Sequence, residues 1–445
     1  MNIKDSKLYR LYDINKDRPL FRAIHKIRER MYLSENIARA RINYKKMCSI
    51  KRNADSPVKV VFLIQYLVNW GKSEQLYRIM EADDRFDPIL LCVPYNLNAS
   101  KNGNETYKWF NSRGYNCINA SLGDNQWYDL EGLSPEYVFY ARPYNSAIPE
   151  VYSSHIVSAY AKVCSYIYGY LLAAEEIRNS INRDFYDYCY TYYACSEDDN
   201  RYFNAKKHSA FQRSIYLGYP GLSRFARSEA NKTTSWGSWT SEHTRFRALW
   251  TPRWSTDERV GGSNFFKYKE DFLSYAGINK DVELMIRPHP LAFGNFIKTG
   301  EMTEQEVKDF KVLCETTENL SLDEDFDYVE TFLNTDVLIS DYSAIMAEFF
   351  ATGKPMIYCE SNSKFNQDYT ESMKEILEGT YIAENFEDIE KYIEMLRSGR
   401  DPLRENRIQA IEKLWGYKLE MCPQLIADDI WNDSRHSRNS NNKGR

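Results

Sequence analysis

The stretch DVLISDYSAIMAEFFA, residues 336–351, decides the fold class. Its first part, Asp336 to Ile339, is an apolar strand, and its last part, Ser343 to Ala351, has the spacing of a helix. The polar turn Ser340-Asp341-Tyr342-Ser343 lies between them. An apolar run without alternation is typical of a strand buried on both faces, as in parallel sheets covered by helices. This segment therefore predicts an α/β protein in which strands lead directly into helices.

The same alternation of strands and helices runs through most of the chain. Val58 to Gln65 is a nearly continuous apolar and β-branched run, and further strands are expected up to about residue 141. A tyrosine-rich stretch, about Asp184 to Ala205, is predicted to be one long helix. The pattern restarts at strand Arg247 to Thr251 and continues to strand Pro355 to Cys359. We therefore predict two doubly wound domains in tandem, each built on a parallel sheet.

Changes in composition give the expected domain bounds. A basic helical arm covers residues 1–56, and a first Rossmann-like domain covers residues 57–222. Ser223 to Glu242 is rich in Ser, Thr and Asn and is expected to be a linker or loop. The second Rossmann-like domain covers residues 243–420. The tail, residues 432–445, is expected to be disordered because it contains no apolar residue.

The composition is that of a folded globular protein. Of 445 residues, 43% are hydrophobic and 27% are charged. No apolar run reaches the length of about 18 residues that a membrane-spanning helix needs. The nine cysteines are scattered without a Cys-x-x-Cys pair, which is typical of free thiols in a reducing compartment. Because the first residues also lack the pattern of a signal peptide, the expected compartment is the cytoplasm.

Charge is divided unevenly along the chain. Residues 1–52 carry 15 Lys and Arg against 5 Asp and Glu, whereas the rest of the chain is acidic. The expected helix of this arm, Leu20 to Cys48, has a thin apolar stripe flanked by arginines, which leaves two alternatives. It lies on an anionic membrane surface, or it packs on the body of the protein or on a partner subunit. No nucleic-acid partner is expected, because no recognisable binding motif follows the arm.

Two strand-to-helix turns in the second half carry the residues best suited to chemistry, because ligands of open α/β sheets bind beyond the carboxyl ends of the strands. Arg287-Pro288-His289-Pro290 holds a cation and an imidazole in a rigid turn, where they can contact a phosphate or move a proton. The alternative is a surface turn whose prolines end the strand.

The second turn, Ser340-Asp341-Tyr342-Ser343, opens the predicted helix. The free N–H groups and the dipole of a helix start suit a diphosphate. Glu348, one helical turn further on, is placed to accept hydrogen bonds from ribose hydroxyls. The alternative is that Ser343 only caps the helix and that Glu348 is solvated.

Other polar groups are weaker candidates. The stretch Asp323 to Asp327 contains Asp-x-Asp, a metal-binding pattern in some sugar transferases, but helix capping by Asp327 fits it better. Gly71 and Lys72 lack the remaining positions of a P-loop. The histidines outside the Arg287 turn have no ligand spacing to one another, so no metal or other cofactor is expected to be required. The general base stays open among His155, Glu150 and Glu175, with His155 where an acceptor pocket is expected.

Four motifs, taken in order, resemble a known family. They are LWTPRWS (residues 249–255), the Arg287 turn, the Ser340 turn with Glu348, and Gly353-Lys354-Pro355. Together they are similar to the CDP-glycerol glycerophosphotransferase family of teichoic-acid and capsule synthesis. Tyr166 to Tyr170 and Gly218 to Gly221 resemble the capsule-type branch of that family. The resemblance covers roughly residues 58–420.

The resemblance implies a GT-B type glycosyltransferase architecture, in which two Rossmann-like domains face a cleft. The donor nucleotide lies in the C-terminal domain and the acceptor lies across the cleft. Arg287 and His289 would contact the donor diphosphate as catalytic candidates, together with His155. The donor-binding set is Arg253, Ser340, Asp341, Ser343, Glu348 and Lys354.

Two departures from the family pattern matter. Tyr168-Gly169-Tyr170 stands where many members carry Trp-His-Gly, and Arg253 stands where relatives often carry a histidine. The proposed base of the family is therefore missing or displaced in this chain.

The expected function is that of a transferase, peripheral on the inner face of the plasma membrane. It moves glycerol phosphate, or a similar polyol phosphate, from CDP-glycerol or another nucleotide-activated donor to a glycan or lipid-linked polymer acceptor, and it releases CMP. One alternative is an inverting glycosyltransferase that uses a nucleotide sugar in capsule or lipopolysaccharide synthesis. A second is a non-catalytic glycan-binding scaffold subunit, motivated by the missing histidine and by 35 tyrosines.

Overall fold

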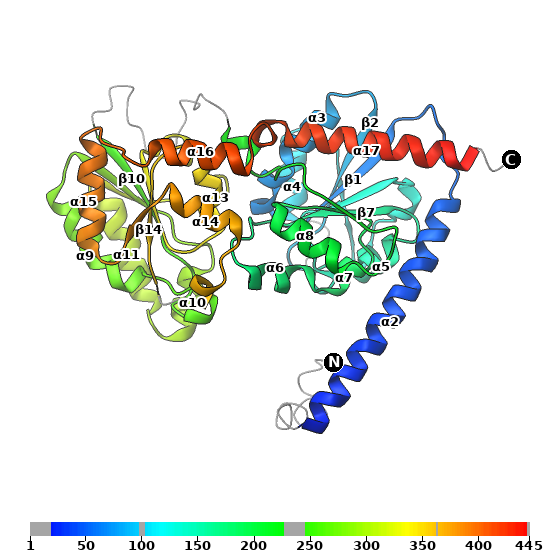
Figure 1. Cartoon of the computed structure of the whole chain (residues 1–445), viewed down its shortest axis with the longest axis horizontal. Coiled ribbons are helices and arrows are strands. Elements are labelled where there is room, and N and C mark those ends of the chain that lie inside the picture. The colour runs from blue at the N-terminus through cyan, green and yellow to red at the C-terminus, as the bar shows by residue number, and fades with distance from the viewer. Residues whose placement is uncertain (1–18, 98–102, 227–244, 362–363, 443–445) are drawn as a thin grey trace.

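The computed structural model describes residues 19–97, 103–226, 245–361 and 364–442, which form two α/β halves joined side by side (Figure 1). Most of the expected linker Ser223 to Glu242, the start of the arm and the last three residues of the tail lie outside the described residues. We call the two halves the first and second domains.

The first domain is built on a seven-stranded parallel sheet in the order β3-β2-β1-β6-β7-β8-β9. Successive residues of β1 pack into different apolar clusters on the two faces, so β1 is buried on both sides as predicted. A small antiparallel pair, β4 (Ser121–Gly123) and β5 (Gln126–Trp127), lies apart from it. The strands of the sheet are β1 (Val58–Ile64), β2 (Phe86–Cys92), β3 (Cys117–Asn119), β6 (Tyr137–Tyr140), β7 (Lys162–Tyr166), β8 (Thr191–Tyr193) and β9 (Arg213–Ile215).

The second domain has a six-stranded parallel sheet in the order β12-β11-β10-β13-β14-β15. This is the 3-2-1-4-5-6 order of a Rossmann-type sheet. Its strands are β10 (Phe246–Thr251), β11 (Val282–Ile286), β12 (Leu320–Leu322), β13 (Val337–Ser340), β14 (Met356–Cys359) and β15 (Tyr381–Ala383).

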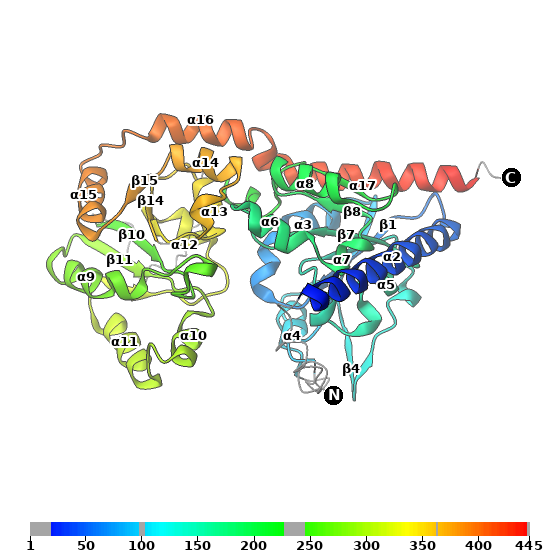
Figure 2. The same cartoon turned by 60° about the horizontal axis from the view of Figure 1, so that its bottom comes forward.

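Helices cover both faces of each sheet (Figures 1 and 2). In the first domain they are α3 (Glu74–Glu81), α4 (Glu105–Asn111), α5 (Ser154–Val157), α6 (Ala174–Ile181), α7 (Asp184–Asp187) and α8 (Glu197–Lys206). In the second they are α9 (Phe265–Ile278), α10 (Ala292–Thr299), α11 (Glu304–Thr316), α12 (Val329–Leu333), α13 (Ile345–Phe350), α14 (Glu371–Glu378), α15 (Phe386–Arg397) and α16 (Arg404–Leu414).

The chain returns to the first domain through α17 (Lys418–Asn442), which packs against α3 (Figure 1). Cys422, Ile426 and Ile430 of this helix are buried in the core of the first domain. The expected disorder of residues 432–445 is therefore wrong for Asn432 to Asn442. These residues are polar, but Asp433 pairs with Lys162 at 2.6 Å and Arg438 pairs with Glu136, so ion pairs replace the missing apolar contacts.

The predicted long helix from Asp184 to Ala205 is also wrong. It divides into α7, the buried strand β8 and α8. Ser196 and Asp199 form a capping box that starts α8. The tyrosines of this stretch are therefore divided among α7, β8, α8 and the turn between α7 and β8, and they do not belong to one continuous helix.

The arm is helical as predicted, in α2 (Pro19–Ser49). Its second half packs on the first domain: Asn36 donates to Asp187 at 2.9 Å, and Tyr44 stacks on Phe211 with ring centroids 4.5 Å apart. Within the described residues, no helix combines the length and the apolar content needed to span a membrane.

Candidate active site

Three loops of the second domain lie side by side because of the strand order. β10 lies between β11 and β13, and the three strands are parallel. Their carboxyl ends bring together Arg253, the Arg287–His289 turn and the Ser340–Ser343 turn. The order of connections reverses between β10 and β13, which is where open α/β sheets bind ligands. The two motifs singled out in the sequence are therefore neighbours in space.

Asp341 connects these loops from inside the protein. Its buried carboxylate accepts hydrogen bonds from the backbone N–H of Arg253 at 2.8 Å and from the N–H and side-chain amide of Asn264 at 3.0 and 2.8 Å. Burial raises the pKa of Asp341, and these donors oppose the rise. Asp341 is thus occupied in positioning the loops, which contradicts a direct donor contact.

Arg253 places a positive charge beside the Ser340–Ser343 turn. Its guanidinium donates to the carbonyls of Val260 and Tyr342 and lies 5.3 Å from the ring centroid of Tyr342. Gly261 permits this approach, because it has a φ of +108° and an added Cβ would lie 2.5 Å from Nε of Arg253. Burial lowers the pKa of Arg253, yet a guanidinium stays charged at neutral pH.

Arg287 and His289 occupy different environments although one proline separates them. Arg287 is buried, with its guanidinium 2.7 Å from Asp323 and 4.7 Å from the ring centroid of Tyr328. His289 is a surface residue, and Nδ1 of its ring accepts a hydrogen bond from the N–H of Leu291 at 3.2 Å. Arg287 is therefore a fixed internal charge, and His289 is the group that a ligand can reach.

His289 is neutral at neutral pH. Loss of hydration in its crowded surroundings, together with the charges of Arg253 and Arg287, lowers its pKa to about 4. Since Nδ1 is an acceptor, we assign the proton of the neutral ring to Nε2. His289 is therefore suited to donate one hydrogen bond to an anion and is a weak base.

The helix after the Ser340 turn begins later than predicted. α13 starts at Ile345 with Ala344 at the N-cap, so Ser343 is not the capping residue. The Ser343 hydroxyl accepts a long 3.5 Å bond from the N–H of Ile345. Ser340 is fully buried and donates to the carbonyl of Asp341 at 2.8 Å. Of the two serines, Ser343 is the better placed to meet a ligand.

Glu348 lies in a buried cluster that joins the two domains. Lys72, at the end of the 3-10 helix Leu67–Lys72 that follows β1, forms an ion pair with one carboxylate oxygen. The hydroxyl of Tyr328 donates to the other oxygen, and Lys72 donates to Tyr328 at 2.8 Å. The side chains of Lys72 and Glu348 are only 5% and 3% exposed, so the alternative of a solvated Glu348 is wrong.

The positive charge of Lys72 is kept by its partners. Burial alone would lower the pKa of Lys72, but the Glu348 carboxylate and the Tyr328 hydroxyl reverse this effect and leave the pKa raised. The cluster is thus an ion pair at neutral pH.

Two predicted site residues lie elsewhere. Lys354 precedes β14, so it lies at the amino edge of the sheet, opposite the edge where the turns gather. It donates to the carbonyls of Leu333 and Thr335, and this position contradicts a donor-binding role. His155 lies on α5 and pairs with Glu150 at 2.9 Å. Helix α5 lies beside α2 and farther from the second sheet than α6 does (Figures 1 and 2).

The sequence pointed to Glu175, but its neighbour Glu176 makes the contact between the domains. The hydroxyl of Tyr342 donates to Glu176 at 2.7 Å, and the N–H of Leu172 donates to it at 3.2 Å. Burial raises the pKa of Glu176, opposed by the Tyr342 bond and by Arg253. No sequence pattern distinguishes Glu176 from Glu175, because only the pairing of the two domains selects it.

The acidic stretch Asp323 to Asp327 is used internally. Asp323 pairs with Arg287, and Asp327 pairs with Arg224 at 2.7 Å and accepts from the N–H of Val329 at the start of α12. Across the described ranges, no three His, Cys, Asp or Glu side chains gather closely enough to hold a metal ion.

The family model for CDP-Glycerol:Poly(glycerophosphate) glycerophosphotransferase matches residues 168–431, which is more than half of the chain. The chain belongs to this family. It is a transferase of the CDP-glycerol glycerophosphotransferase type and takes a nucleotide-activated donor. No curated protein matches the chain.

Solved structures share the fold of this glycerophosphotransferase-family protein at low identity. The wall teichoic acid polymerase TagF has a TM-score of 0.55 at 14% identity and covers 93% of this chain and 99% of its own. A TagF variant soaked with CDPG has a TM-score of 0.52 at 14% identity, with 92% and 98% covered. UDP-GlcNAc 2-epimerase from Neisseria meningitidis, bound to UDP-GlcNAc, has a TM-score of 0.53 at 11% identity, with 84% and 100% covered. The predicted GT-B type architecture is confirmed.

The family match begins at Tyr168, in the loop that follows β7. The next residue, Gly169, faces the second domain, since a Cβ added to it would lie 3.3 Å from the Cβ of Ala344. In this glycerophosphotransferase-family chain, the loop Tyr168-Gly169-Tyr170 therefore borders the Ser340–Ser343 turn.

Proposed function

We propose that the protein transfers glycerol phosphate, or a similar polyol phosphate, from a CDP-linked donor to a hydroxyl of a bacterial surface glycan or of a teichoic or capsule polymer. CMP is the leaving product. The observation that carries this proposal is the meeting of Arg253, His289 and Ser343 at three adjacent strand ends in a member of this family. These groups suit the diphosphate of such a donor.

In the proposed reaction, an acceptor oxygen attacks the β-phosphorus of the donor. The new oxygen–phosphorus bond forms while the bond from that phosphorus to the oxygen of CMP breaks, and CMP leaves with the electron pair. Phosphoryl transfer depends mainly on positioned positive charge and hydrogen-bond donors. Arg253 supplies a charge beside the turn, and the Nε2–H of His289 donates to a phosphate oxygen.

The proton of the acceptor hydroxyl needs a base. We assign this base to Glu176 rather than to His155, Glu150 or Glu175. Glu176 faces the Ser340–Ser343 turn from the first domain, through its hydrogen bond with Tyr342. Burial raises the pKa of Glu176, which makes its carboxylate a better proton acceptor than an exposed one. The weak basicity of His289 also leaves this step to another group.

The proposed ribose contact of Glu348 requires a local change. Both carboxylate oxygens already have partners, on Lys72 and Tyr328, and the side chain is buried. A ribose hydroxyl reaches Glu348 only when one of these partners moves aside. The proposal therefore includes a small opening between the domains when the donor binds.

We place the protein on the inner face of the plasma membrane, through α2. The exposed apolar residues Ile27, Met31 and Ile42 lie within one face of this helix, with the basic residues Arg28, Lys45 and Lys46 close by. This stripe supports the membrane alternative for the arm, while Asn36 and Tyr44 hold another face of α2 on the first domain. No metal or cofactor is assigned to the reaction, so turnover in EDTA is expected to equal turnover without it.

The proposal is tested by thermal stabilisation with CMP, CDP, CDP-glycerol, UDP and GDP. A ligand at about a hundredfold excess over its dissociation constant stabilises the folded state by about 2.7 kcal/mol. Selective stabilisation by the cytidine compounds is expected. Selective stabilisation by UDP or GDP would favour the nucleotide-sugar alternative, and no response would favour the scaffold alternative.

A further inference from the structure

A group of arginines and tyrosines lies where the first sheet ends. Arg142 and Tyr144 follow β6, Tyr168 follows the neighbouring strand β7, and Arg183 lies between α6 and α7. We call these four residues the Arg–Tyr patch. Because β6 and β7 are adjacent parallel strands, their carboxyl ends place these loops together at one edge of the sheet.

Direct contacts hold the patch together. The hydroxyls of Tyr144 and Tyr168 are 3.0 Å apart. The guanidinium of Arg183 lies 4.4 Å from the ring centroid of Tyr144, and that of Arg142 lies 5.2 Å from it. Tyr168 is 40% exposed, so the patch reaches solvent. Two guanidinium groups over the ring of Tyr144, beside the exposed Tyr168, form a surface with hydrogen-bond donors at its edges.

The positive charge of the patch is not neutralised within the described part of the chain, where neither Arg142 nor Arg183 forms an ion pair. The Nε of Arg183 is buried there without a hydrogen-bond partner. The nearest carboxylate in sequence, Asp184, accepts from the amide of Asn145 at 3.2 Å and from the N–H of Phe185. Two guanidinium groups are therefore available to an anion.

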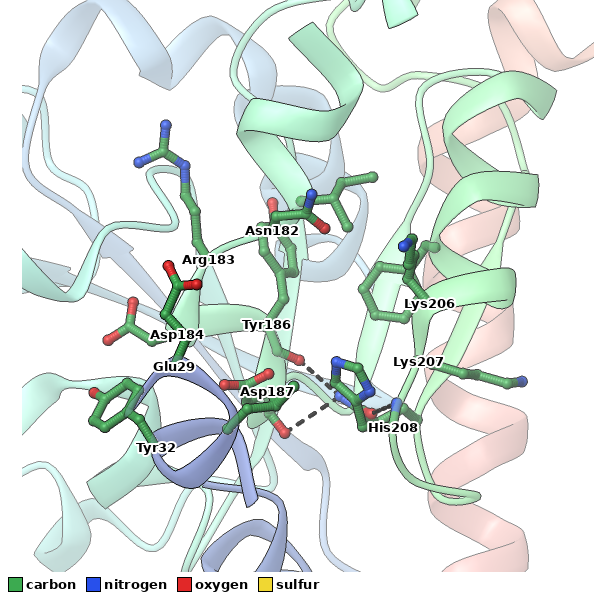
Figure 3. Close-up of a pocket in the computed structure, with 14 residues that line it drawn as sticks. Glu29, Tyr32, Asn182, Arg183, Asp184, Tyr186, Asp187, Lys206, Lys207 and His208 are labelled. Carbon is green, nitrogen blue, oxygen red and sulfur yellow. Dashed lines mark hydrogen bonds between the residues drawn. The ribbon is translucent and has the colours of Figure 1, made fainter. Parts of the chain in front are cut away.

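Arg183 also marks the border between the patch and a cavity of about 420 Å³ beneath α2. Figure 3 shows its guanidinium pointing away from Asp187 and His208, which also line the cavity. The cavity wall mixes carboxylates such as Glu29 with lysines such as Lys206, so it does not select for one sign of charge. An anionic chain would therefore be held at the patch rather than inside the cavity.

The patch borders the proposed donor site. Tyr168 precedes Gly169, and a Cβ added to Gly169 would point at Ala344, the residue after Ser343. An acceptor hydroxyl must come within bonding distance of the donor phosphorus, so an acceptor site has to adjoin the Ser340–Ser343 turn. Of the loops of the first domain, the one that carries Tyr168 meets this condition.

We infer that the Arg–Tyr patch binds a phosphodiester-linked polyol chain, the acceptor polymer. Its phosphates lie against Arg142 and Arg183, and its carbon chain and hydroxyls lie against Tyr144 and Tyr168. The inference rests on the proposed function for the identity of the polymer. It goes beyond that function in assigning the residues that hold the acceptor.

The test uses the full-length protein and a synthetic hexamer of glycerol phosphate as the probe. Direct binding and the acceptor KM are measured for the wild type, for the double variant R142Q/R183Q and for R113Q. Arg113 is a matched control because it also stacks on an aromatic ring, with its guanidinium 4.0 Å from the centroid of Trp109, outside the patch. The melting temperature of each variant reports whether it is folded.

Loss of two charge-assisted phosphate contacts is expected to weaken hexamer binding and raise the acceptor KM by more than about tenfold in R142Q/R183Q. R113Q is expected to bind the hexamer with wild-type affinity and to keep the wild-type acceptor KM. The thermal shift caused by CDP-glycerol is expected to be the same in R142Q/R183Q as in the wild type. A hexamer that does not bind the wild type, or that binds a folded R142Q/R183Q equally well, overturns the inference. Hexamer binding that depends on the patch, without CMP release from CDP-glycerol, overturns the proposed function and leaves the patch as a polyanion site.

Discussion

Lys72 of the first domain and Glu348 of the second form an ion pair that is buried from solvent and shared with Tyr328. Each residue follows a strand of its own sheet, so the pair joins the carboxyl edges of the two sheets. One apolar cluster also contains residues of both domains, such as Val61 of the first and Met346 of the second. The two domains are therefore joined by a buried ion pair and by a shared apolar cluster.

Removing one member of this pair is predicted to be costly. In Lys72→Met, Glu348 loses its cation, and breaking a buried pair in this way typically costs about 3–5 kcal/mol of unfolding free energy. Urea unfolding measures the loss. The double variant K72M/E348Q should recover most of it, because no uncompensated charge remains. The exposed pair Arg78–Glu81 provides the control, with an expected cost below about 1 kcal/mol for R78Q. If K72M loses no more unfolding free energy than R78Q, Lys72 and Glu348 do not form a buried ion pair.

His289→Ala is predicted to lower kcat by more than about tenfold, the range of a lost hydrogen bond to a charged phosphate oxygen. His289 lies at the surface, and among the described residues its ring has one hydrogen-bond partner, Leu291, so the melting temperature should change little. Steady-state CMP release measures kcat. His436→Ala, on α17, is the matched control and should keep wild-type turnover. Unchanged turnover in a folded His289→Ala protein removes His289 from the mechanism.

The protonation of His289 is predicted to respond to the donor. Its pKa is lowered to about 4 in the free protein, and the negative diphosphate should raise it because the imidazolium then gains a partner. A pH titration of the His289 ring by NMR, with and without CDP, measures both values. A free-protein midpoint at the ordinary histidine value, or no upward shift with CDP, contradicts the geometry.

The lowered pKa of His289 also affects the stability of the folded protein. Between the pKa of about 4 in the folded state and the ordinary value near 6.5 in the unfolded state, the unfolded chain binds more protons. The contribution of His289 to stability therefore increases as pH rises through this window and is complete above it. Unfolding of the wild type and of His289→Gln, followed from about pH 4 to about pH 7, should show a difference that grows with pH in favour of the wild type. A pH-independent difference contradicts the shift.

The arm is predicted to bind anionic membranes through its exposed stripe. The triple variant I27E/M31E/I42E places carboxylates on exposed positions of α2 and should reduce sedimentation with anionic liposomes at low salt by more than about tenfold. Ile278→Glu is the control, since Ile278 is 80% exposed on the second domain. Equal sedimentation of the triple variant and the wild type refutes a membrane role for this stripe.

The sequence was sufficient for the parts of the fold with strong local patterns. Buried strands such as β1, β10 and β13 are continuous apolar runs, and the turns after β11 and β13 carry unusual polar motifs. Their neighbourhood follows from the doubly wound pattern alone. Short strands such as β8 and β12 were missed because three residues give no periodicity.

The details of the site depended on contacts between distant segments. Glu348 is 276 residues from Lys72, and Glu176 is 166 residues from Tyr342, so no local pattern could pair them. Lys354 was assigned to the donor site because a sequence motif alone does not show which edge of the sheet its residues occupy. The same reason explains α17, whose polar end is ordered by partners on the first domain.

Transfer of a polyol phosphate from a CDP-linked donor can be followed through both of its products. The most direct measurement is simultaneous detection of CMP and of labelled glycerol phosphate on the hexamer, starting from CDP-glycerol labelled in the glycerol. Equal amounts of the two products are expected with the wild type, and more than about tenfold less of both with His289→Ala. CMP without incorporation of label, or no product from CDP-glycerol while a UDP-sugar or GDP-sugar is consumed, would contradict this transfer.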